Sequence, residues 1–173
     1  MSQASPHMPS ALASTTAAQT IFLFESPVLP DWIDYNGHMN AYYVVAFSKA
    51  IDGFMLHIGM DETFRASQSV SIYTLQSMVT YLQEVAEAEP IIVKGQLLES
   101  DSKKLRLFMT MYHGESYDTL ATMETLLLHM DMKQHKASPF LAQTQSLIDV
   151  IQTQHAELET PQNAGKAIAI KRK

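Results

Sequence analysis

The residues best suited to chemistry stand together in one short stretch, DWIDYNGHMNAYYVV, at positions 31–45. Two aspartates, a histidine, two asparagines and a glycine precede an apolar run there. Taken singly, each has a structural explanation, since Asn36-Gly37 is a strong turn dipeptide and Asn40 is suited to cap a helix. Taken together, they indicate a carboxylate that a glycine-containing turn delivers to the start of a helix.

Such an arrangement has a definite chemical potential. The N-terminus of a helix presents unpaired backbone N–H groups and a partial positive charge. These groups can hold an anion or a developing oxyanion. A carboxylate beside them can act as a nucleophile or as a base that activates water. The stretch therefore offers both halves of an acyl-transfer reaction without a Ser-His-Asp triad or a metal.

Other chemistries have less support. The chain contains no cysteine, which excludes disulfides, thiolate metal sites and a cysteine nucleophile. We expect no metal site, because the histidines are scattered without paired ligand spacing, at His38, His57, His113, His129 and His135.

Hydrophobic periodicity predicts the elements that position this stretch. We expect a first strand over 21–29 and a helix over about 41–58, where apolar residues recur at steps of three and four. Asn40 is the expected N-cap of that helix, and Gly59 is its expected C-terminal stop. The segment 69–85 is β-rich with broken parity, which indicates a long strand with a bulge or bend.

Three further strand patterns, over 90–100, 104–114 and 119–132, are spaced as an antiparallel meander. We expect one face to be shared by Leu105, Leu107, Met109 and Met111 in the second pattern, and by Leu120, Glu124, Leu126 and Leu128 in the third. The pair Ser138-Pro139 is the expected start of a helix reaching about Ala156. Its apolar stripe would consist of Leu141, Leu147, Ile148 and Ile151.

This order of elements predicts an α+β fold, an antiparallel β-sheet wrapped around a long central helix. With 173 residues, 46 % of them apolar, we expect a disordered N-terminal arm over 1–20, a folded domain over 21–137, a C-terminal helix over 138–157 and a loose tail over 158–173. A single sheet of this size leaves an exposed edge, so self-association is expected.

Charge and hydropathy narrow the setting. The formal net charge of -6 argues against nucleic acid as a partner, because phosphates require a basic face. No stretch approaches the roughly 18 apolar residues of a membrane span. The first twenty residues hold no Lys or Arg and lack the solid apolar core of a secretory signal. We therefore expect a soluble, cytoplasmic protein with no membrane partner.

The segment DWIDYNGHMNAYYVVAFSKA, with the helix and strands behind it, resembles the hotdog-fold thioesterases of the 4-hydroxybenzoyl-CoA thioesterase type, over roughly residues 21–135. In that family an aspartate, and a glycine three residues later, precede the long central helix. Within the family the chain is most similar to the thioesterases of bacterial carnitine breakdown. The resemblance implies a hotdog fold and hydrolysis of betainyl-CoA to betaine and coenzyme A. It implies no cofactor, since coenzyme A is part of the substrate.

Carried over residue by residue, the catalytic aspartate of the family falls on Asp34 and its glycine on Gly37. The oxyanion donor would be a backbone N–H around Asn40 or Ala41. The family is divided between a covalent anhydride and direct activation of water by the carboxylate, and the sequence does not choose between them. Asp31, the rival carboxylate, lies three residues too early to match.

Two alternatives remain open. The chain departs from the family pattern at His38-Met39-Asn40, where many relatives have apolar residues. A hotdog hydratase or dehydratase relies on a histidine with an acidic partner, and His38 beside Asp34 keeps this function open. A non-catalytic acyl-CoA-binding protein would use Asp34 only as a turn residue. The glycine spacing favours the thioesterase.

The resemblance also directs attention to residues that would bind the substrate. A quaternary ammonium acyl group would be bound by aromatic faces, and the available rings belong to Trp32, Tyr35, Tyr42, Tyr43, Tyr73 and Tyr81. We expect the first five of these at the substrate site, although each is equally suited to a core or an interface. The phosphates of coenzyme A would meet cations among Arg65, Lys103, Lys104, Arg106, Lys133 and Lys136. The expected partners are thus a small acyl-CoA and a second copy of the chain, in a homodimer or a dimer of dimers.

Overall fold

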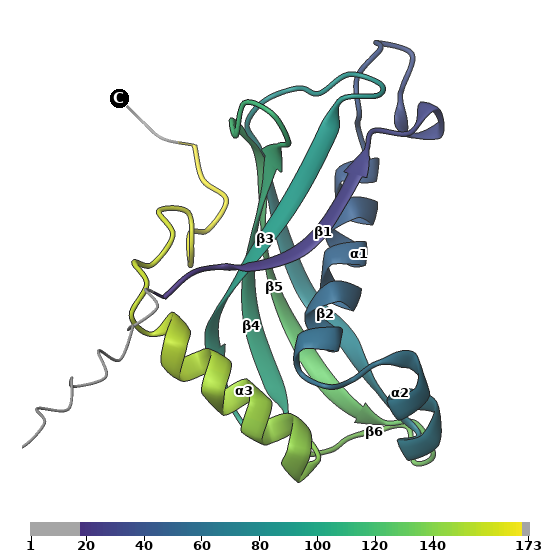
Figure 1. Cartoon of the computed structure of the whole chain (residues 1–173), viewed down its shortest axis with the longest axis vertical. Coiled ribbons are helices and arrows are strands. Elements are labelled where there is room, and N and C mark those ends of the chain that lie inside the picture. Colours follow the sequence, from purple (N-terminus) through teal and green to yellow (C-terminus); the bar gives the residue numbers. More distant parts are fainter. Residues whose placement is uncertain (1–17, 171–173) are drawn as a thin grey trace, which may run out of the picture.

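The computed structural model describes residues 18–170, and the arm expected over residues 1–20 lies almost wholly outside them. The chain forms one curled sheet with a long helix against it (Figure 1). In chain order the elements are β1 (Ile21–Pro27), the 3-10 turn η1 (Pro30–Trp32), α1 (Tyr42–His57), α2 (Glu62–Gln68), β2 (Val70–Tyr81), β3 (Pro90–Ser100), β4 (Lys104–His113), β5 (Thr119–Asp131), β6 (Lys136–Ala137) and α3 (Ala142–His155).

The sheet is antiparallel throughout, with strand order β1-β3-β4-β5-β2 and with the short β6 paired to β5. The expected meander of β3, β4 and β5 is confirmed. The bulge expected in β2 is confirmed between Thr74 and Gln76, where the register against β5 shifts. In the described sheet β1 and β2 are the two edges. The end of β2 lies near the start of α1.

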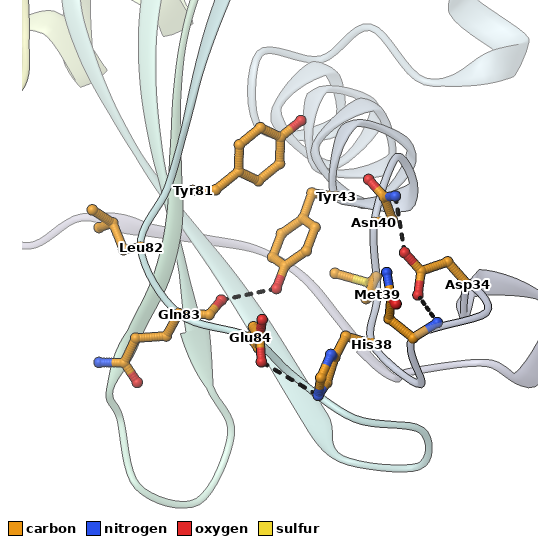
Figure 2. Close-up of a pocket in the computed structure, with 10 residues that line it drawn as sticks. Asp34, His38, Met39, Asn40, Tyr43, Tyr81, Leu82, Gln83 and Glu84 are labelled. Atoms are coloured by element: carbon orange, nitrogen blue, oxygen red, sulfur yellow. Dashed lines mark hydrogen bonds and ion pairs between the residues drawn. The ribbon is translucent and has the colours of Figure 1, made fainter. Parts of the chain in front are cut away.

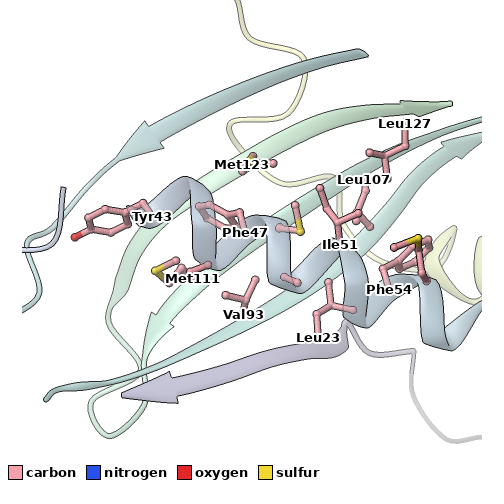
Figure 3. Close-up of a cluster of buried hydrophobic side chains, with 14 of the residues drawn as sticks. Leu23, Tyr43, Phe47, Ile51, Phe54, Val93, Leu107, Met111, Met123 and Leu127 are labelled. Carbon is pink, nitrogen blue, oxygen red and sulfur yellow. The ribbon is translucent and has the colours of Figure 1, made fainter. Parts of the chain in front are cut away.

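Burial of one face of α1 against the sheet builds the core (Figure 3). The buried residues of this helix are Tyr43, Ala46, Phe47, Ala50, Ile51, Phe54 and Met55. Alternate residues of β4 oppose them, and the expected face of Leu105, Leu107, Met109 and Met111 is confirmed, each with 0 % exposure. Burying each large apolar side chain contributes roughly 1.5–3 kcal/mol, so this contact determines how the helix lies on the sheet.

The end of α1 follows the expected pattern. Gly59 has a φ of +72°, and the N–H of Met60 donates to the carbonyl of Met55 at 2.8 Å. This is the hydrogen-bond pattern with which helices end at a left-handed glycine. The predicted stop at Gly59 is therefore confirmed.

Of the residues expected to share one face of β5, Glu124, Leu126 and Leu128 do so, but this is not the face that meets the helix. Met123 and Leu127 are buried in the core, whereas Glu124, Leu126 and Leu128 are only partly buried on the other face. The strand carries apolar residues on both faces because the C-terminal segment covers part of its outer side near Leu126. Alternation alone could not decide which face meets the helix.

The predicted start of the C-terminal helix is also wrong. α3 begins at Ala142, and its N-cap residue, Leu141, makes no side-chain capping bond. Ser138 instead contacts a buried histidine, because Nδ1 of His129 lies 2.9 Å from the Ser138 carbonyl and 3.1 Å from its hydroxyl. Of the expected stripe, Ile148 and Ile151 are buried while Leu141 and Leu147 are exposed.

The seven-residue α2 was not predicted, because it is too short to show an apolar repeat. Asp61 caps this helix, accepting the N–H of Phe64 at 2.7 Å. The two-residue β6 was missed for the same reason. No helix within residues 18–170 has the length and hydropathy to cross a membrane.

The described part of the C-terminal tail is attached to the outer side of the sheet. The N–H of Gly165 donates to the carboxylate of Glu124 at 2.7 Å, and that carboxylate also accepts Nε of Arg106 at 2.6 Å. Further along, Ile168 is 93 % exposed. The tail is therefore held as far as Gly165.

A glycine inside α1 sets how closely that helix approaches β1. A Cβ atom at Gly53 would overlap the backbone carbonyl of Leu23, which cannot move independently of its strand. We expect Gly53→Ala to lower the free energy of unfolding by about 1–3 kcal/mol, despite the better helix propensity of alanine. Urea denaturation measures this change. Ser48→Ala, on the exposed face of the same helix, is the control and should not destabilise the protein; equal stability of the two variants would contradict the close contact.

Candidate active site

The loop before α1 is a small, closed turn. Ile33 and Met39 form an antiparallel bridge. Between them the N–H of Asp34 donates to the His38 carbonyl, and the N–H of Gly37 donates to the Asp34 carbonyl, each at 3.0 Å. Gly37 has a φ of +82°, a conformation that residues with a Cβ atom rarely adopt. The turn predicted at this glycine is confirmed, and it brings Asp34 back toward the helix.

Two hydrogen bonds orient the carboxylate of Asp34 (Figure 2). Oδ1 accepts the backbone N–H of Asn36 at 2.8 Å, and Oδ2 accepts the side-chain amide of Asn40 at 3.0 Å. The bond from Asn36 is the main cause that lowers the pKa of Asp34 below its ordinary value, and the bond from Asn40 adds to it against an opposing effect of burial. The carboxylate is therefore ionised at neutral pH, and each oxygen retains a lone pair for a substrate or a water molecule.

Asn40 does not cap the helix as predicted. The N-cap position is Ala41, which makes no side-chain capping bond, and the amide of Asn40 reaches back to Asp34 instead. Because the Asn40 amide donates to a charged acceptor, this hydrogen bond is a strong one and it orients the side chain.

The first turn of α1 leaves backbone donors free. The N–H groups of Tyr43 and Val44 are already used, by the carbonyls of Asn40 at 3.2 Å and Ala41 at 3.1 Å. Those of Ala41 and Tyr42 make no hydrogen bond within residues 18–170, as expected for the start of a helix. The carboxylate of Asp34 thus lies beside a set of unpaired N–H groups.

The segment that follows β2 forms the opposite wall of a groove of about 770 Å³ (Figure 2). The groove is lined by Asp34, Asn36, His38, Met39, Asn40, Tyr43, Tyr81, Leu82, Gln83 and Glu84. Two hydrogen bonds tie this wall to the helix and the loop: the hydroxyl of Tyr43 donates to the Gln83 carbonyl at 2.9 Å, and the N–H of Met39 donates to the Val85 carbonyl at 3.1 Å.

Tyr43 is buried at the bottom of the groove. Burial, and to a smaller extent the nearby Glu84 and Tyr81, raise the pKa of Tyr43 to about 12. Its hydroxyl therefore stays protonated and keeps its bond to Gln83 at any pH near neutral. The ring packs edge-on with that of Tyr81, with centroids 5.4 Å apart and an interplanar angle of 85°.

His38 has a different acidic partner from the one expected. Its Nε2 lies 3.3 Å from Oε2 of Glu84, whereas only its backbone contacts Asp34. Local sequence patterns could not predict this contact, because Glu84 lies 46 positions after His38 in the chain, beyond β2. Only the pairing of β2 with β5, which directs the end of β2 toward α1, brings it here.

Of the five aromatic residues expected at the substrate site, only Tyr43 lines the groove. Trp32 is buried and stacks on Tyr42, with centroids 6.1 Å apart. Tyr35 is 96 % exposed at the tip of the turn, and Tyr73 lies near the opposite end of β2 from the groove. The five rings were candidates by side-chain type alone, and the fold brings only Tyr43 among them to the groove.

Two of the cations expected to meet phosphates are already engaged elsewhere. Arg106 pairs with Glu124 and with Glu99, at 2.6 and 3.2 Å, and Arg65 donates to the Met60 carbonyl at 2.8 Å. No Lys or Arg lines the groove in the described part of the chain. The groove is consequently an acidic and aromatic site.

Comparison with known proteins agrees with this geometry. The sequence model of the Thioesterase-like superfamily matches residues 28–148, which include the turn, α1, the meander and the start of α3. This chain belongs to the thioesterase-like superfamily. The hotdog fold expected from the sequence is confirmed by this match and by solved structures that share the arrangement of the sheet and the helix.

Two relatives of this chain have names that state an activity. It is 34 % identical to a protein named betainyl-CoA thioesterase from Pseudomonas aeruginosa strain PAO1, over 88 % of this chain and 97 % of that protein. It is 31 % identical to an L-carnitine dehydrogenase/betainyl-CoA thioesterase from Rhizobium meliloti strain 1021, over 92 % of this chain but only 32 % of that longer protein.

Two solved structures cover most of the chain. A putative thioesterase from Pseudomonas putida KT2440 has a TM-score of 0.76 and 28 % identity, over 89 % of this chain and 99 % of that one. A hypothetical protein from Staphylococcus aureus in complex with CoA has a TM-score of 0.83 over 92 % of this chain and 100 % of that one. At 22 % identity, the second shows similarity of fold alone.

The conformation of Gly37 leads to a test of the turn. A Cβ atom at this position meets nothing within 4 Å, so substitution acts through the backbone alone. We expect Gly37→Ala to destabilise the turn by about 1–2 kcal/mol. Gly37→Asn should be milder, because asparagine tolerates the left-handed conformation. Faster amide hydrogen exchange over 33–40 in the alanine variant than in the asparagine variant is the expected result; equal exchange in both would contradict a backbone origin.

The bond from Asn40 predicts the ionisation of Asp34. Asn40→Ala removes one hydrogen bond to the charged form, so the pKa of Asp34 should rise toward its ordinary value. The carbon-13 shift of the side-chain carboxyl, followed against pH, measures the change. Asp101 is an internal control, because its low pKa depends on the backbone of Lys103 and Lys104 and should not move. An unchanged titration of Asp34 would show that Asn40 has no influence on its charge.

Proposed function

We propose that this chain is an acyl-CoA thioesterase that hydrolyses betainyl-CoA to betaine and coenzyme A. The observation that carries the proposal is the position of Asp34, an ionised and oriented carboxylate beside the free N–H groups at the start of α1. Membership of the superfamily supports the reaction, and the named activity of the Pseudomonas aeruginosa relative supports the acyl group.

Asp34 has two possible roles, and both use the same geometry. As a nucleophile, its carboxylate oxygen attacks the thioester carbon, the carbon–sulfur bond breaks, and water then hydrolyses the resulting anhydride. As a general base, it takes a proton from a water molecule whose oxygen attacks that carbon, and the proton passes to the leaving thiolate. In either case negative charge develops on the carbonyl oxygen, where the N–H groups of Ala41 and Tyr42 stabilise it.

The assembly and setting form part of the same proposal. The groove lies open, and the edge strand β2 exposes the apolar side chains of Tyr73 and Leu75. A second copy would cover such an edge, so we infer a homodimer or a dimer of dimers. We also infer a cytoplasmic setting and no cofactor, with coenzyme A entering as part of the substrate.

Release of free thiol from a panel of acyl-CoA thioesters tests the reaction and the substrate together. We expect Asp34→Ala and Asp34→Asn to lower kcat by about 10²–10⁴-fold, the range for loss of a catalytic acid or base. Asp31→Asn, which removes a carboxylate from the exposed turn η1, is the matched control and should remain within a few-fold of the wild type. Hydrolysis by Asp34→Ala within a few-fold of the wild type would refute the mechanism.

The pairing of His38 with Glu84 supports a second candidate function, because hotdog hydratases use a histidine with an acidic partner. The same panel separates the two. Consumption of an unsaturated acyl-CoA without release of thiol, kept in Asp34→Asn and lost in His38→Ala, would favour hydration, because hydration leaves the thioester intact. Binding of acyl-CoA without any turnover would indicate the non-catalytic alternative.

A further inference from the structure

The wall opposite Asp34 carries an exposed ring and a carboxylate that the proposed chemistry does not use. We propose that Tyr81 and Glu84 form the subsite for the cationic head of the acyl group, Tyr81 through its ring and Glu84 through its charge. This inference rests on the proposed function, since it assumes that the thioester carbon lies beside Asp34.

The charge of the groove suits a cationic ligand. Among the residues that the structure describes, Asp34 and Glu84 are the two carboxylates that line the groove, and no Lys or Arg lines it. The side chain of Glu84 is 76 % exposed, and Nε2 of His38 lies 3.3 Å from its carboxylate. Such a surface attracts a cation and repels an acyl group that carries a carboxylate. The groove is therefore complementary to a positively charged acyl chain.

The short distance between the positive charge of the substrate and its reacting carbon also places the cation in this groove. In a betainyl thioester a single methylene separates the quaternary nitrogen from the carbonyl carbon, so the cation must lie in the same groove as the attacked atom. Trp32 and Tyr42, which stack on one another, do not line the groove, and neither does Tyr73. Figure 2 shows Tyr81 and Glu84 around the same space as Asp34.

The side chains of Tyr81 and Glu84 also offer the kinds of contact that a quaternary ammonium can make. A quaternary ammonium has no N–H to donate, so it is recognised by aromatic faces and by charge rather than by hydrogen-bond acceptors. Tyr81 is 57 % exposed although its ring packs against buried Tyr43. An aromatic ring left partly open in an acidic groove is the surface that such a cation requires.

The wall is also held rigidly in place. The N–H groups of Leu82 and Gln83 both donate to the Leu120 carbonyl, at 2.9 and 3.0 Å, and the Gln83 carbonyl accepts the hydroxyl of Tyr43 at 2.9 Å. The backbone between Tyr81 and Glu84 is thus fixed on both sides. A preorganised subsite loses little entropy when it binds its ligand.

The test compares two thioesters of the same shape. Betainyl-CoA and 3,3-dimethylbutyryl-CoA differ in a charged nitrogen or a neutral carbon at the branching atom. We expect the wild type to prefer the charged substrate, and Glu84→Gln and Tyr81→Leu each to lower kcat/KM for betainyl-CoA about tenfold. Hydrolysis of the neutral thioester should stay within about threefold, and Tyr81→Phe should keep the preference, because the ring rather than the hydroxyl is required.

Glu87→Gln is the matched control, because Glu87 is exposed in the same connection between β2 and β3 and lies outside the groove. It removes the same charge from the chain and should leave the preference unchanged. An equal loss for both thioesters in Glu84→Gln or in Tyr81→Leu would overturn the subsite. Equal hydrolysis of both by the wild type would overturn it too, while leaving the thioesterase intact, whereas no hydrolysis of any acyl-CoA would overturn the proposed function itself.

Discussion

Burial of one face of α1 in the hollow of the curled sheet is the contact on which the candidate site depends. The helix is held by apolar side chains along its length, from Tyr43 at one end to Met55 near the other. Its first turn, where Tyr43 is the first buried residue, therefore cannot shift without disturbing the core. Because the helix start is fixed, its unpaired N–H groups are fixed too, and the loop before it has a rigid surface on which to fold.

Local patterns could predict the parts of the site that lie near one another in the chain. The turn at Gly37, the helix behind it and the stop at Gly59 each depend on a few neighbouring residues, and each is found in the structure. Asn40 shows the limit of this reasoning. Its type suits a helix cap, but the nearby charge of Asp34 takes its amide, and propensity contains no information about that hydrogen bond.

The far wall of the groove depends on contacts that no local pattern reveals. Glu84 reaches His38 only because β2 pairs along β5 and ends near the start of α1. The sequence leaves undecided which face of β5 meets the helix for a related reason: this strand is apolar on both sides, and tertiary packing alone assigns the sides. The sequence thus predicts the half of the site that precedes α1, and the arrangement of the sheet supplies the half that follows β2.

The bond from the Tyr43 hydroxyl to the Gln83 carbonyl has a consequence for how such a groove can change over time. The spacing between its two walls is determined by main-chain atoms, together with one buried phenol that stays neutral. The exposed parts of Tyr81 and Glu84 project from this frame into the groove. Substitutions there can alter which acyl groups fit while the distance between carboxylate and opposite wall is preserved, so a lineage could acquire new substrates without rebuilding its reaction centre.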